Sequence, residues 1–104
     1  VLDTHTAVAV DVYDKYVIST SDVTKAVIVS TASPFKFNES VVKAIAGEKA
    51  VAGKSEFELL SVLSEISGMK IPAPLKELDK KPVLHKEICD PMDMMEKVKE
   101  ALKI

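Results

Sequence analysis

The sequence predicts an α/β chain that is mostly helical and contains one buried strand at about residues 25–32. Two observations support this class. Several segments carry helix-capping residues followed by apolar side chains at every third or fourth position, which is typical of amphipathic helices. The run KAVIVSTA at residues 25–32 is instead rich in β-branched residues and apolar on both faces. Such a run is typical of a strand buried between the layers of a parallel sheet.

The first segment, residues 1–20, fits two structures. Valines at alternate positions from 8 to 12 suggest a strand, whereas Val8, Val12 and Tyr16 lie four residues apart, as on one face of a helix. The apolar pattern outlasts an average strand of about five to six residues, which favours a helix. Two residues could cap this helix at its start, Asp3 or Thr4. The alternative is a strand that forms a hairpin with residues 25–32.

Two helices with clear boundaries follow the predicted strand. Asn38 can cap the first, which should end near Gly47. Ser55 and Glu58 have the spacing of a capping box for the second, in which each side chain accepts a hydrogen bond from the other residue's backbone amide. We expect this second helix to end near Gly68.

The C-terminal third carries one further helix. Asp90 followed by Pro91 is a favourable pair of cap and first helical residue. The helix that follows places three apolar residues on one face, Met95, Val98 and Leu102. Residues 70–89 contain three prolines, which interrupt regular structure. We therefore expect an irregular connection there, with one short helical turn around Leu75–Leu78.

One strand among four helices leaves a structural problem. A buried strand without partners has unpaired backbone donors and acceptors on both edges, at a cost of roughly 1–3 kcal/mol for each buried group. The strand could pair with residues 1–20 in a hairpin, with a second copy across a dimer, or with strands elsewhere in a longer protein. Because position 1 is Val and not Met, we expect the last of these three arrangements.

Composition narrows the range of functions. The 104 residues carry a net charge of −2, and all 14 cationic side chains are Lys. Proteins that bind nucleic acids usually have a basic surplus and use Arg to contact phosphates and bases, so that class is disfavoured. No apolar run approaches the roughly 20 residues that cross a membrane, so no membrane partner is expected. A single cysteine, Cys89, cannot form an internal disulfide, which favours a cytoplasmic location.

The best candidate site is the segment STASPFKF at residues 30–37. It follows the carboxyl end of the predicted strand, where ligands bind in open α/β sheets, and its hydroxyl groups can hydrogen-bond a ligand. His5 is a possible acid–base group. His85 and Cys89 are spaced like half of a zinc site, but no second pair completes it, so no metal site is predicted. No Gly-rich loop that could hold a phosphate is present either.

Two segments together resemble the C-terminal region of threonine synthase. They are LDTHTAV at residues 2–8 and STASPFKF at residues 30–37. The separation between His5 and Thr31 along the chain also suits that family. The close resemblance covers roughly residues 1–47, and the remainder is similar only in its layout.

This resemblance implies that residues 1–104 are a single C-terminal segment of a pyridoxal-phosphate-dependent enzyme of the tryptophan synthase β-like group (fold type II). Its larger parallel sheet would include the predicted strand. The implied enzyme is a cytoplasmic lyase of threonine biosynthesis that converts O-phospho-L-homoserine and water to L-threonine and phosphate. The Schiff-base lysine and the phosphate-binding loop would lie outside this chain, so the chain alone should be inactive. Its partners would be the remainder of the parent chain and the small-molecule substrate.

By the same resemblance, Thr31 would bind the cofactor. A Thr at this position in the family hydrogen-bonds the pyridine nitrogen, and a hydroxyl can donate to an unprotonated nitrogen, which makes the ring a milder electron sink. His5, Ser30 and Ser33 would support this contact without acting as the base. The sequence departs from the family at two positions, because many members carry Pro at the position of Thr4 and His at that of Ser33.

Two alternatives to threonine synthase stay open. A related pyridoxal-phosphate-dependent lyase that acts on serine or threonine would share the architecture, and the residues that bind the substrate phosphate are not evident in this chain. A stand-alone helical module that dimerises or binds another protein belongs to a different class. In both that module and an isolated fragment of the enzyme, self-association would use the strand at residues 25–32, whose edges are unpaired.

Overall fold

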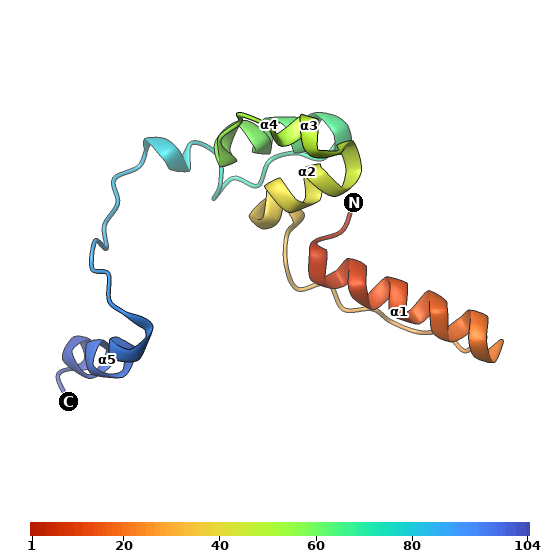
Figure 1. The fold of residues 1–104 in the computed structure, drawn as a ribbon, viewed down its shortest axis with the longest axis horizontal. Coiled ribbons are helices and arrows are strands. Elements are labelled where there is room, and N and C mark those ends of the chain that lie inside the picture. The colour runs from red at the N-terminus through yellow and green to blue at the C-terminus, as the bar shows by residue number, and fades with distance from the viewer.

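The computed structural model describes residues 1–104, and its regular elements are all helical. The α-helices are α1 (Thr4–Thr20), α2 (Asn38–Ala46), α3 (Glu48–Val51), α4 (Glu56–Ser67) and α5 (Met94–Leu102). Three short 3₁₀ helices are η1 (Pro34–Phe37), η2 (Leu78–Lys80) and η3 (Pro91–Asp93). Figure 1 shows three parts along the chain: α1 with the segment that returns beside it, the group α2 to α4, and α5 at the end of a long connection.

Helix α1 confirms the helical prediction for the first segment. Asp3 is its N-cap, and the carboxylate accepts hydrogen bonds from the backbone amides of His5 at 3.0 Å and Thr6 at 3.3 Å. The helix ends at Ser21, which adopts a left-handed conformation with φ of 57° and donates its amide proton to the carbonyl of Val17. The alternative of a hairpin between this segment and residues 25–32 is therefore wrong.

Residues 25–32 do not form the predicted strand, and the α/β fold class is wrong for this structure. The segment passes back along α1 (Figure 1), and Val27 and Val29 are 89% and 72% exposed instead of buried. A strand forms only where a second backbone offers free donors and acceptors. The neighbour here is a helix, whose backbone groups already bond to one another. Whether the chain self-associates through this segment stays a prediction.

The hydrophobic core lies among η1, α2 and α4. It consists of six buried side chains: Phe35, Val41, Val42, Leu59, Leu60 and Leu63. Helix α2 ends at Gly47 and α4 ends at Gly68, where φ is +83° and +68° and glycine is free of the strain that a side chain would add. The Ser55–Glu58 capping box opens α4 with both reciprocal hydrogen bonds present. These three predicted boundaries are confirmed.

Asn38 differs from its predicted role as a cap. It is the first residue of α2, and Phe37 occupies the cap position without a side-chain hydrogen bond. The Asn38 side chain is buried and donates to the backbone carbonyl of Glu56 at 2.6 Å. This hydrogen bond joins the start of α2 to the start of α4, so Asn38 stabilises the packing of the two core helices.

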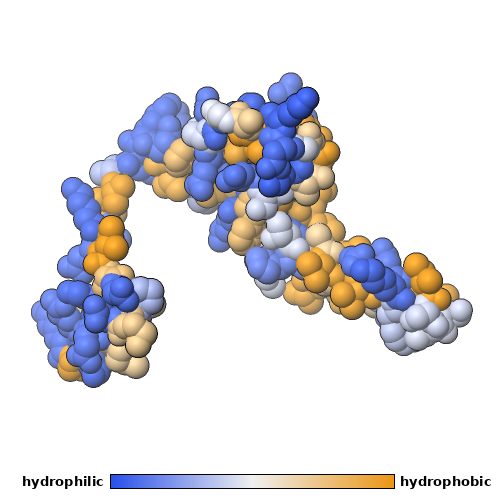
Figure 2. Space-filling model, in the orientation of Figure 1, coloured by the Kyte–Doolittle hydropathy of each residue, from blue (hydrophilic) through white to orange (hydrophobic).

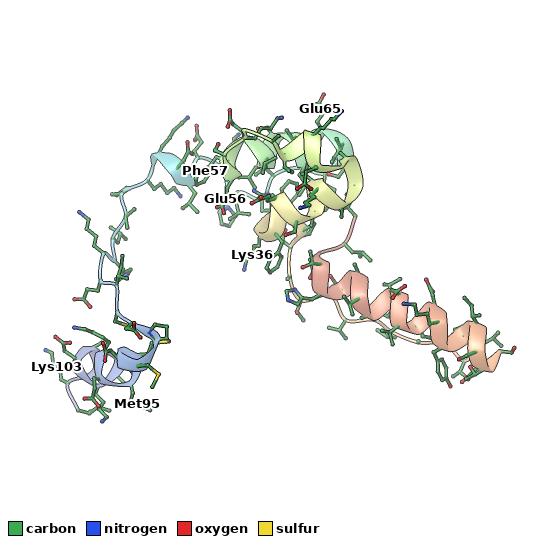
Figure 3. All side chains as sticks on the ribbon, viewed as in Figure 1. Lys36, Glu56, Phe57, Glu65, Met95 and Lys103 are labelled. Carbon is green, nitrogen blue, oxygen red and sulfur yellow. The ribbon has the colours of Figure 1, made fainter.

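The C-terminal part extends away from this core. Turns at residues 73–77 and η2 follow α4, near the helical turn that the sequence predicts at 75–78. The Asp90 carboxylate caps η3 by accepting from the amide of Met92 at 3.1 Å, and α5 follows directly. Figure 3 shows Met95 on α5, well separated from Phe57 on α4. The apolar face predicted for this last helix is thus present but exposed.

The overall shape is open. The radius of gyration is 18.8 Å, whereas a compact chain of this length has about 13 Å. Only 10 of the 104 residues are buried. Figure 2 shows apolar surface along α1 and on the connection that leads to α5. None of the helices combines the length and the apolar character that crossing a membrane requires. The chain therefore leaves much of its apolar surface uncovered.

Candidate functional site

Three polar residues meet where the start of α1 faces the end of residues 22–33, the returning segment that passes back along this helix. Asp3 is 1% exposed and Thr6 is 5% exposed. The hydroxyl of Thr6 and the hydroxyl of Ser30 each lie within hydrogen-bond distance of Asp3 Oδ2. Thr6 Oγ1 also lies 3.1 Å from Ser30 Oγ. This Asp3–Thr6–Ser30 cluster joins two segments that are far apart in the sequence.

The two oxygens of the Asp3 carboxylate have separate partners. Oδ1 accepts from the backbone amides of His5 and Thr6 and so caps the helix. Oδ2 accepts from the Thr6 hydroxyl and, at 3.4 Å, from the Ser30 hydroxyl. The hydrogen bond from the Thr6 side chain, aided by the two backbone amides, lowers the pKa of Asp3 below its ordinary value. Oδ2 therefore has one close partner, the Thr6 hydroxyl, and a longer contact with the Ser30 hydroxyl.

The returning segment is also joined to the far end of α1. The hydroxyl of Tyr16 donates to the carboxylate of Asp22 at 2.8 Å, and the hydroxyl of Tyr13 donates to the backbone carbonyl of Thr24 at 3.3 Å. Because Tyr13 faces Thr24 while Thr6 faces Ser30, the segment runs antiparallel to the helix. Side-chain hydrogen bonds at both ends therefore hold the segment against α1 in place of a strand ladder.

His5 lies beside this cluster at the surface. Its side chain is 76% exposed, and Nδ1 is 3.5 Å from Asp3 Oδ1. The imidazole ring packs edge-on against Phe37, with the ring centroids 5.2 Å apart. Through Phe37, His5 connects the start of α1 with η1.

Thr31 and Ser33 follow Ser30 and differ in their surroundings. Thr31 is exposed, and its side chain takes part in none of the hydrogen bonds within the chain. Ser33 caps η1, where its hydroxyl accepts from the amide of Phe35 at 3.3 Å. The structure therefore gathers His5 and Ser30 around Asp3, presents Thr31 to solvent next to them, and gives Ser33 a local structural role.

Asp3 and Thr6 are the site residues that the sequence analysis missed. Asp3 was predicted only as a possible cap, and Thr6 was not singled out. The one available signal was the spacing Asp-x-x-Thr at a helix start, which places the Thr hydroxyl over the capping carboxylate. Nothing in that spacing points to Ser30. No group of three or more His, Cys, Asp or Glu residues is arranged to hold a metal ion.

Comparison with known proteins identifies the family of this chain. The family model described as "Threonine synthase, C-terminal" matches residues 6–103. No curated protein and no solved structure matches the chain. The matched range contains all of α1 except its first two residues, the returning segment with Ser30 and Thr31, the helical core and α5. The match includes nearly the whole chain, which therefore belongs to the family of threonine synthase C-terminal regions.

Proposed function

We propose that this chain is the C-terminal part of a cytoplasmic, pyridoxal-phosphate-dependent threonine synthase that converts O-phospho-L-homoserine and water to L-threonine and phosphate. The family match over residues 6–103 carries this proposal. The chain's role in that enzyme is to present Thr31 to the cofactor. Pyridoxal phosphate, when bound, supplies the electron sink for the reaction.

The chemistry around Thr31 fits the ring nitrogen of that cofactor. Thr31 is exposed and its hydroxyl is free to donate a hydrogen bond outward. The nearest carboxylate of the cluster, Asp3, is buried, and both of its oxygens are engaged by Thr6, His5 and Ser30. The neutral Thr31 hydroxyl is therefore accessible to the ring nitrogen, and the Asp3 carboxylate does not compete for that nitrogen. Such a donor suits a pyridine nitrogen that stays unprotonated, because a carboxylate partner would instead stabilise a protonated ring.

The lysines of this chain support the proposal that it is inactive alone. A lysine that attaches to an aldehyde must be neutral when it attacks, which burial favours. All 14 lysines are exposed. The hydrogen bond and charge of Glu48 raise the pKa of Lys43, and those of Glu100 raise the pKa of Lys97. No lysine is buried within the chain itself, and on the family resemblance we place the cofactor-binding lysine in another part of the enzyme.

The open shape supports a role as one segment of a larger protein. Isolated domains cover their large apolar side chains, whereas Val12 on α1, Val27 beside it and Ile88 before α5 are at least half exposed. The remainder of the parent chain is the natural cover for these surfaces. On this view the helical core of α2 and α4 holds the segment together, and α1 with its returning segment contacts the catalytic part.

The test uses the complete reading frame that contains this sequence. We would express the protein, remove and restore pyridoxal phosphate, and follow phosphate release from O-phosphohomoserine. Cofactor-dependent release with threonine as the product is the expected result. If the folded, cofactor-loaded protein releases no phosphate, the chain would instead be part of another pyridoxal-phosphate-dependent lyase. A protein that does not bind the cofactor would contradict the proposal altogether.

A further inference from the structure

We propose that Asp3 and Thr6 are positioning residues that act through Ser30 to hold Thr31 in place for its contact with the cofactor ring. This inference rests on the proposed function of Thr31. It concerns residues that neither the family match nor the sequence motifs assign to any role. The observations that carry it are the hydrogen bonds of the Asp3–Thr6–Ser30 cluster and the burial of two of its three members.

The returning segment has few other means of staying in place. It belongs to no sheet, and valines 27 and 29 are exposed. Its hydrogen bonds to α1 lie near its two ends, at residues 22–24 and at Ser30. A segment of eight residues can span about 26 Å when extended, so the fixation at Asp22 does little to position Thr31. Ser30 therefore fixes the Thr31 backbone on its N-terminal side, and Ser33, which caps η1 before the buried Pro34, fixes it on the other side.

Proton directions make Asp3 the centre of the cluster. Thr6 has a single hydroxyl proton and donates it to the Asp3 carboxylate, so within the cluster the Ser30 hydroxyl can donate to Asp3 Oδ2 or to Thr6 Oγ1. Asp3 is a fixed acceptor, since it is buried and its other oxygen is bound by the first amides of α1. Through Ser30, the position of Thr31 is therefore fixed relative to the start of α1, a helix of 17 residues.

The separate functions of the two carboxylate oxygens allow a clean set of variants. Asp3→Ser keeps an N-capping hydroxyl but lacks the second oxygen that reaches Ser30. Ser30→Ala removes the contact from the other side, and Ser30→Thr restores a hydroxyl at an exposed position that has room for a methyl group. Tyr16→Phe is the matched control, because it deletes one hydroxyl-to-carboxylate hydrogen bond between the same two segments at the far end of α1.

The experiment uses the complete enzyme and two readouts that do not require turnover. The first is amide hydrogen exchange at residues 29–32 in the cofactor-free protein. The second is the dissociation constant for pyridoxal 5′-phosphate, measured together with the absorption spectrum of the bound cofactor. We expect Asp3→Ser and Ser30→Ala to exchange faster at these amides, to bind the cofactor about tenfold more weakly and to alter its spectrum. Ser30→Thr and Tyr16→Phe should resemble the wild type in both readouts.

The outcomes separate this inference from the proposed function. Wild-type exchange in Ser30→Ala would overturn the positioning role. Faster exchange with an unchanged cofactor dissociation constant and spectrum would overturn the link to the cofactor. Equal effects in Tyr16→Phe and Ser30→Ala would mean that any loosening of the segment suffices, which also contradicts a specific role for Asp3. If the wild-type enzyme fails to bind the cofactor, the proposed function fails before any variant is compared, and the exchange rates still decide whether Asp3 holds Ser30.

Discussion

Ser30 Oγ lies 3.4 Å from Asp3 Oδ2, although the two residues are 27 positions apart in the sequence. This hydrogen bond brings the end of an irregular segment to the capped start of a helix. Asp3, which holds the segment, is buried, whereas Thr31, the residue next to Ser30, is exposed to solvent. The hydrogen bond to Asp3 explains how a segment outside any sheet can hold the Thr31 hydroxyl in a defined place.

The first prediction concerns the Thr31 hydroxyl itself. In the complete enzyme, Thr31→Ala should lower kcat/KM by about tenfold to a hundredfold, because a hydrogen bond to a buried ring atom contributes roughly 1–3 kcal/mol. Thr31→Ser keeps the hydroxyl and should retain most of the activity. Phosphate release under saturating cofactor measures both variants. Wild-type turnover in Thr31→Ala would remove Thr31 from the site.

The second prediction tests the helical core. Leu63 on α4 is fully buried, and Leu63→Ala should destabilise the chain by about 2–5 kcal/mol through lost burial and the cavity left behind. This variant should therefore lose the part of the helical signal that comes from α2 and α4, the two helices of the core. Ile66 lies one turn further along α4 and is 42% exposed, so Ile66→Ala should cost under about 1 kcal/mol.

Urea unfolding of the 104-residue chain, followed by circular dichroism at 222 nm, compares the two core variants. The wild type and Ile66→Ala should unfold at similar urea concentrations. If Leu63→Ala unfolds together with them, the six-residue core among η1, α2 and α4 does not hold the chain together.

Helix boundaries in this chain were predictable because their signals are local. The capping box at Ser55 and Glu58 and the glycines at 47 and 68 each act through atoms within a few residues of the boundary. Such signals need no knowledge of the rest of the fold. Asn38 is an instructive exception: its Oδ1 accepts from the amide of Glu39 at the start of its own helix, whereas its Nδ2 donates to the carbonyl of Glu56 on α4, a contact that no local signal predicts.

The segment at residues 25–32 could not be predicted by the same means. Its β-branched residues favour the extended backbone of a strand. A strand also needs a second strand to pair with, and whether one lies alongside depends on the whole fold. In this chain the only neighbour is α1, so the segment remains without a ladder. The Asp3–Thr6–Ser30 cluster was missed for a related reason, because local spacing cannot reveal a contact between distant segments.

The third prediction follows from the exposed connection before α5. Residues 81–90 have no regular structure, whereas Lys43 and Lys49 lie within helices. A lysine-specific protease should therefore cut the chain after Lys86 before it cuts at either helical lysine, because local unfolding is needed only for the latter. Mass spectrometry of a time course identifies the first products. A Lys86→Ala variant should lose the early cut, and early cleavage after Lys43 would contradict the packing of α2.

The last prediction concerns pH and the start of α4. The backbone amide and hydroxyl of Ser55, with a smaller effect from Lys54, lower the pKa of Glu58 below its ordinary value. A lowered pKa in the folded state means that Glu58 stabilises the fold fully at neutral pH. This contribution is lost as the pH falls below the pKa of a free glutamate, about 4.3, and through the lowered value.

Glu58→Gln and Ser55→Ala should therefore behave differently as the pH falls. Glu58→Gln lacks the titrating group, so it should be less stable than the wild type at pH 7 and should approach the wild type in acid. Ser55→Ala removes the hydroxyl that accepts from the Glu58 amide at any pH, at a cost of about 1 kcal/mol, and should stay less stable throughout. Urea unfolding at pH 7 and in mild acid measures both differences. A gap between wild type and Glu58→Gln that widens in acid would show that the carboxylate does not stabilise the cap, since an ionised Glu58 accepts the two hydrogen bonds from Ser55 more strongly than a protonated carboxyl group does.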